Sequence, residues 1–112
     1  MVALTAALFA MGDGASAACA YFVQNPTRSG QTVSATGGRS GCSTSVDWVN
    51  VYLRKQRTGL PDINIASNSA DVPDPINVTR TASTIHVDPL TARTRVTSST
   101  GALSESGWVS GL

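Results

Sequence analysis

Charged residues, and lysine above all, are scarce in this sequence. Only 13% of its 112 residues are charged, Lys55 is the single lysine, and the formal net charge is +1. Helical bundles usually expose many Glu and Lys side chains, so this composition disfavours a helical protein and suits a β-protein with polar turns. The charge gives no general attraction to a polyanion, which argues against nucleic acid as a partner. A hydrophobic fraction of 41% argues against disorder, and the length fits one domain.

Residues suited to catalysis or metal binding are also few. The single histidine, His86, stands two residues before Asp88, but no nucleophile-elbow motif accompanies this pair, so we expect a surface histidine and no enzyme. Asp71, Asp74 and Asp88 have no calcium-loop spacing, and Ca²⁺ needs about six to eight oxygen ligands. One histidine and two cysteines make zinc still less favourable. We therefore expect no catalytic residue, no metal and no cofactor.

The N-terminal apolar run is too short to span a membrane. Residues 2–11 carry no charge, whereas a transmembrane helix needs roughly 20 apolar residues. Glycines flank Asp13 directly after the run, and the small residues 15–17 match an export cleavage site. We predict a signal peptide over residues 1–17 and a secreted domain over residues 18–112, without stable membrane insertion in its mature form. The alternative is a buried first element of the fold.

The chain has two cysteines, Cys19 and Cys42. In an exported protein, a low and even count indicates a disulfide. A bridge that closes a loop of this length would contribute roughly 3 kcal/mol in the chain-entropy model. The alternative is acylation of Cys19 after cleavage, although Ser16 stands where lipoprotein signals usually have Leu.

Short alternating segments follow the signal and are separated by turn residues. Turns are expected at 25–26, 37–41 and 59–62, and the prolines of 71–75 make that segment a loop or a sheet edge. The strands that we predict cover residues 18–24, 31–36, 46–55, 63–69, 76–81, 91–99 and 102–109, with 84–87 extending the fifth strand or starting another. Ile76 and Val78 should point inward. Strands of this length and spacing predict an all-β protein, a single antiparallel β-sandwich of about seven strands, of the Ig-like kind.

Segment 46–55 is the clearest strand and has two different faces. Val49, Val51 and Leu53 alternate onto one face, which we assign to the core. The opposite face carries Val46 and four residues suited to ligand binding, which are Trp48, Asn50, Tyr52 and Arg54. The two aromatic rings could stack on sugars or anchor a protein, and the polar pair could orient the ligand. The assignment can also be reversed, because large aromatic side chains are usually largely buried.

Three stretches together resemble a known group of proteins. They are residues 33–42 (VSATGGRSGC), residues 51–55 (VYLRK) with Pro61-Asp62 downstream, and residues 94–101 (TRVTSSTG). They look like uncharacterised small secreted proteins of actinobacteria, which are expected to be single Ig-like β-sandwiches. The resemblance implies a much later partner for Cys42, where this chain has residues such as Ala82 and Ser83. It implies a fold and no activity.

Two functional hypotheses follow from these patterns. The first is a non-catalytic binding module for polysaccharide, cell wall or protein, which uses Trp48, Asn50, Tyr52 and Arg54. The second is a secreted inhibitor or effector that binds another secreted or cell-surface protein. Its contact residues would lie in the turn 37–41, with Arg39, and in the loop 71–75, with Asp74.

Overall fold

A computed structural model describes residues 19–112 of this chain. The predicted signal peptide, residues 1–17, lies outside the described residues, as does residue 18. The described part forms eight strands, all paired antiparallel: β2 (Ala20–Val23), β3 (Thr27–Ser29), β4 (Thr32–Ser40), β5 (Val49–Arg57), β6 (Leu60–Ala70), β7 (Val78–Ile85), β8 (Ala92–Ser98) and β9 (Leu103–Glu105).

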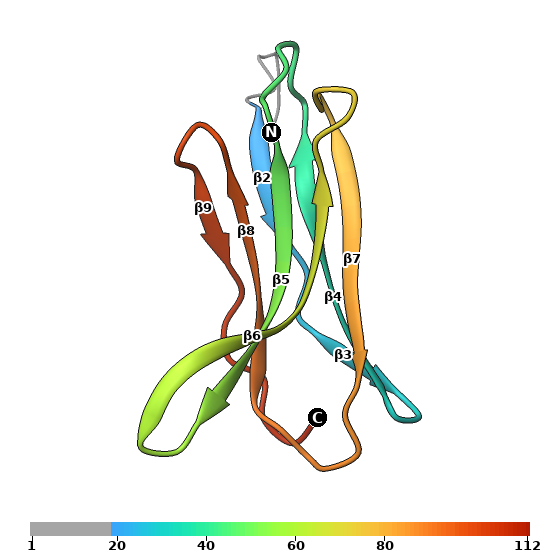
Figure 1. Ribbon diagram of the computed structural model, residues 1–112, viewed down its shortest axis with the longest axis vertical. Coiled ribbons are helices and arrows are strands. Elements are labelled where there is room, and N and C mark those ends of the chain that lie inside the picture. The colour runs from blue at the N-terminus through green and yellow to red at the C-terminus, as the bar shows by residue number, and fades with distance from the viewer. Residues whose placement is uncertain (1–18) are drawn as a thin grey trace, which may run out of the picture.

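The strands form two sheets that pack as a sandwich (Figure 1). In the first sheet, β4 pairs with β7 along one side and with β2 and β3 along the other. The second sheet has the order β6-β5-β8-β9. The predicted all-β antiparallel sandwich is confirmed. The additional strand is β3, because the break at Asn25-Pro26 divides the first edge into two short strands along β4.

The core lies between the sheets and follows the alternation of the strands. Val33 of β4 packs in one cluster with Leu53 of β5, while Val49 and Val51 of β5 pack in a second cluster with Val96 of β8, and all these side chains are fully buried. Each buried Val or Leu side chain contributes roughly 1.5–3 kcal/mol. The inward face predicted for β5 is confirmed, and the reversed assignment, with Trp48 in the core, is wrong.

The prediction of a turn at residues 37–41 is wrong, because β4 continues to Ser40. Gly37 and Gly38 pair with β2 on one side and with β7 on the other. A Cβ atom on Gly37 would lie 2.5 Å from the Val96 side chain, and one on Gly38 would collide with the Val78 carbonyl group. The glycines are therefore needed because neighbouring strands approach them closely inside the sheet. The Gly-Gly pair, which the sequence analysis interpreted as a turn, reflects this close approach.

The starts of β5 and β7 and the orientations of Val46 and Ile76 also differ from the prediction, and the last strand is shorter than predicted, since β9 covers only Leu103–Glu105. Val46 precedes β5 and is buried in the core, and its N–H donates to Pro75 O at 2.9 Å. Ile76 was expected inward but is 44% exposed, because β7 begins only at Val78, which does pack partly against the core. The side chain of Asn77 explains the late start, since it bonds both N and O of the Cys42 backbone.

The hairpin between β5 and β6 is tighter than the predicted turn over residues 59–62. The chain turns at Thr58 and Gly59, where Gly59 has φ of 70°, and β6 begins directly at Leu60. Pro61 fits within the strand because β6 lies at the edge of its sheet and pairs only with β5.

Cys19 and Cys42 form a disulfide, with 4.2 Å between their Cα atoms. The bond connects the start of β2 to the segment after β4, and it confirms the pairing expected from the cysteine count. The alternative, an acylated Cys19, would need the sulfur atom that this bond engages. None of the described residues belongs to an apolar helix of bilayer-spanning length.

Candidate binding face

The four predicted binding residues lie together on the outer face, which we define as the surface of the β6-β5-β8-β9 sheet turned away from the core. Asn50, Tyr52 and Arg54 alternate with the buried residues of β5, and Trp48 stands directly before the strand with the same parity. All four are half-buried. At about 3.3 Å per residue, the row from Trp48 to Arg54 extends for about 20 Å.

Neighbouring side chains from β6 hold the polar groups of this row. Asn50 Nδ2 donates to the Tyr52 hydroxyl at 3.0 Å, and Ser69 donates to the Asn50 Oδ1. Arg54 Nη1 donates to Asn64 Oδ1 at 2.7 Å. The Tyr52 hydroxyl accepts one bond, so its own hydrogen remains available for donation. These contacts fix the row before binding, which lowers the entropy that binding would cost.

The sequence patterns missed the contribution of β8 and β9 to this face. In the register of the sheet, Tyr52 stands opposite Arg95 and Arg54 opposite Arg93. Glu105 of β9 accepts from Arg95 Nε at 2.6 Å and lies 3.3 Å from Arg93 Nη2. The sequence did contain a signal for the contribution of β8, namely its alternation. Every second residue is buried and the residues between them are not; the buried ones are Ala92, Thr94, Val96 and Ser98.

Trp108, which sequence patterns could not place, also belongs to the outer face. The Arg93 guanidinium lies over its ring, 4.3 Å from the centroid. The next residue, Val109, forms a β-bridge with Ala92 and fixes this segment beside β8. Trp48, Tyr52 and Trp108 therefore lie on one side of the same sheet, interspersed with arginines.

His86 and Asp88 contact each other through the backbone. The His86 Nδ1 lies 2.6 Å from the main-chain oxygen of Asp88, so the Asp88 carboxylate is not its partner. Arg28 donates to the main-chain oxygens of both residues. Asp71 and Asp74 precede β7 whereas Asp88 follows it, so the strand separates them. Among the described residues, no three His, Cys, Asp or Glu side chains are placed to share a metal ion.

Arg39, proposed as a contact residue of an exposed turn, is a buried structural residue. It is 5% exposed and donates to Thr44 O at 2.7 Å and to Ile76 O at 2.8 Å. Its guanidinium lies 5.8 Å from the centroid of the Tyr21 ring. Residues 37–41 therefore cannot present Arg39 to a partner.

Tyr21 is the described residue whose pKa departs clearly from its usual value. Burial raises the pKa of its phenol, but hydrogen bonds with Ser98 and Thr100 and the positive charge of Arg39 lower it more. The pKa of Tyr21 therefore lies below 10.0. Tyr21 packs against the core from β2, so this is a structural effect and does not involve the outer face.

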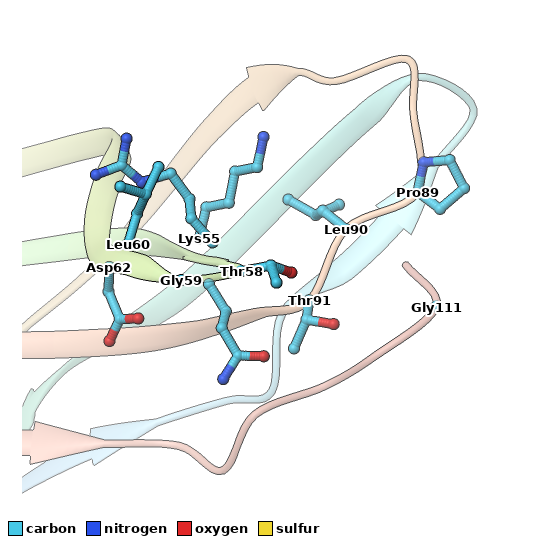
Figure 2. A pocket seen from close by; sticks show the side chains of 11 residues that line it. Lys55, Thr58, Gly59, Leu60, Asp62, Pro89, Leu90, Thr91 and Gly111 are labelled. Carbon is cyan, nitrogen blue, oxygen red and sulfur yellow. The ribbon is translucent and has the colours of Figure 1, made fainter.

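The surface is hollowed at each end of the sandwich. A hollow of about 600 Å³ lies beside the β5–β6 hairpin, between Lys55, Leu60 and Asp62 on one side and residues 89–91 on the other, and Arg57 also lines it (Figure 2). A second hollow, of about 480 Å³, lies along the loop 71–75 and the start of β7. In this loop the Val72 side chain is 89% exposed.

No protein-family model, no curated protein and no solved structure matches this chain. The geometry of its own surface is therefore the basis for a functional proposal.

Proposed function

We propose that this chain is a small secreted, non-catalytic, Ig-like binding domain that binds polysaccharide, including cell-wall polysaccharide, on its outer face. The observation that carries the proposal is the division of β5 into two faces. Val49, Val51 and Leu53 complete the core, which leaves Trp48 and Tyr52 half-exposed on the opposite side. Large aromatic side chains are usually buried, so their presence in a row at the surface calls for a ligand.

The chemistry of this row suits sugars. The ring faces of Trp48 and Tyr52 offer flat apolar surfaces on which sugar rings can stack, while the amide of Asn50 and the guanidinium of Arg54 provide hydrogen bonds to hydroxyl groups. A row of about 20 Å favours a chain of sugars over a single one. Binding is the whole function in this proposal, and no bond is made or broken.

The Ig-like assignment and secretion are supported by separate observations. The strand orders β7-β4-β2/β3 and β6-β5-β8-β9, with all pairs antiparallel, agree with a seven-stranded Ig-like sandwich in which the first strand is divided. Secretion is supported by the disulfide between Cys19 and Cys42 and by the signal-like residues 1–17, since disulfides persist in oxidising compartments.

Co-sedimentation with insoluble polysaccharides and isolated cell walls tests the proposal. We expect the wild type to sediment with at least one polymer and Trp48→Ala to remain in solution while its circular dichroism spectrum is unchanged. Ile85→Ala is the matched control, because it removes an apolar side chain that is 64% exposed on the other sheet. A folded Trp48→Ala that sediments like the wild type would contradict the proposal.

A second candidate function, binding of another protein by the loop 71–75, has one specific observation in its favour. Val72 is 89% exposed and Ile76 is 44% exposed, and both line the hollow beside this loop. Exposed apolar residues beside a hollow are typical of protein contacts. If this candidate is correct, Val72→Asp abolishes binding of a secreted protein partner and Trp48→Ala does not.

A further inference from the structure

The β6-β5-β8-β9 sheet concentrates positive charge that the near-neutral total of the chain conceals. Five of the eight Lys and Arg residues of the chain lie on two neighbouring strands of this sheet: Arg54, Lys55, Arg57, Arg93 and Arg95. The four strands carry two carboxylates, those of Asp62 and Glu105. The whole chain has a net charge of +1, so the basic residues are unevenly distributed and favour anions at this sheet.

The central arginine pair of the outer face is only partly neutralised within the described part of the protein. Arg54 and Arg93 stand directly opposite each other on β5 and β8, a placement in which like charges repel. Arg54 bonds the neutral amide of Asn64, and no described carboxylate forms an ion pair with it. The single carboxylate of Glu105 is shared by Arg93 and Arg95. Three guanidinium groups thus have one carboxylate between them.

The arrangement also holds an arginine in a fixed position. Trp108 supports Arg93 from one side by a cation–π contact at 4.3 Å, and Glu105 fixes it from another. A held guanidinium is suited to carboxylate recognition, because its planar fork can donate two parallel hydrogen bonds. Tyr52 adjoins the arginine pair on β5 and provides a ring on which the sugar that bears the carboxylate can stack.

We propose that the polysaccharide bound on the outer face is acidic, and that Arg54 and Arg93 bind the carboxylate of a uronic acid residue between Tyr52 and Trp108. This inference rests on the proposed function and specifies its ligand. An anion between the two arginines removes the repulsion that the free protein retains. The hollow at the β5–β6 hairpin adds Lys55 and Arg57, beside Asp62, at the end of β5, and two further cations there suit a polymer with repeated carboxylates.

Isothermal titration of the purified protein with polygalacturonate, and with neutral galactan as the comparison polymer, tests this inference. We expect polygalacturonate to bind, to bind more weakly as NaCl increases, and to lose about tenfold in affinity with Arg54→Gln or Arg93→Gln, as expected for a charge-assisted hydrogen bond. Arg80→Gln is the matched control and should change nothing, because Arg80 is exposed on β7 and its side chain reaches only the backbone of Thr79.

The outcomes separate the ligand class from the proposed function. Galactan that binds as tightly as polygalacturonate, with loss of binding in Trp48→Ala, would overturn the acidic ligand and leave a polysaccharide site in place. No binding of either polymer would overturn both. Single-stranded DNA or polyphosphate that binds more tightly than polygalacturonate, with the same dependence on Arg54 and Arg93, would overturn a uronate as the ligand.

Discussion

Substitution of Gly38 by alanine tests the extension of β4 through the glycine pair. The new Cβ atom would collide with the main-chain carbonyl of Val78, and backbone cannot rotate away as a flexible side chain can. Either β4 and β7 separate locally or both strands shift. Overpacking lowers the free energy of unfolding by about 1–3 kcal/mol when neighbouring side chains can move aside. Because main-chain atoms cannot, we expect Gly38→Ala to lower it by at least about 3 kcal/mol. For a domain of this size, that loss lowers Tm by roughly 12 °C or more.

Thermal unfolding followed by circular dichroism measures this effect, and Gly107→Ala is its control. Gly107 has no heavy atom within 4 Å of an added Cβ, so its substitution should leave Tm unchanged or raise it slightly by restricting the unfolded chain. If residues 37–41 formed an exposed turn instead, Gly38→Ala would behave like Gly107→Ala. A Tm within about 2 °C of the wild type would refute the reasoning.

Three further predictions concern the core, the disulfide and a titrating side chain. In urea unfolding, Leu53→Ala should lower the free energy of unfolding by about 3 kcal/mol, because the residue is fully buried. Trp48→Ala should lower it by less than half as much. Breaking the disulfide with Cys42→Ala should cost about 3 kcal/mol in the same measurement, by releasing the unfolded chain. Ultraviolet titration should show a phenol ionising below pH 10.0 that disappears in Tyr21→Phe.

The lowered pKa of Tyr21 also predicts how the stability of the fold changes with pH. The folded-state pKa lies below the unfolded value of 10.0, so between these two values the unfolded state binds more protons. The contribution of this group to stability therefore increases as pH rises through that window and is lost as pH falls. Relative to Tyr21→Phe, a wild type that loses stability in this window would contradict the assignment.

Alternation along the strands was enough to predict the fold and half of the site. The buried residues Val49, Val51 and Leu53 share one parity, and that pattern placed Asn50 and Tyr52 outside correctly. What alternation could not provide is the choice between two self-consistent faces, because large aromatic side chains are usually buried but also serve as contact residues at binding surfaces. Burial by the opposite sheet decides that choice.

Other features depend on contacts between distant segments and were not visible in the sequence. A glycine pair signals a turn and a close strand approach equally well, and only the positions of β2 and β7 distinguish these at Gly37 and Gly38. The basic pair of the outer face requires the register that places Arg54 opposite Arg93. Trp108 is placed by a single β-bridge after β9.

The most direct test of the binding face is a map of backbone amide shifts by NMR during titration with an acidic oligosaccharide. We predict that the shifts concentrate on β5 and β8 and on the indole N–H groups of Trp48 and Trp108, while β4 and β7 stay unchanged. Shifts centred on the loop 71–75 or on the sheet of β2, β4 and β7 would contradict the account.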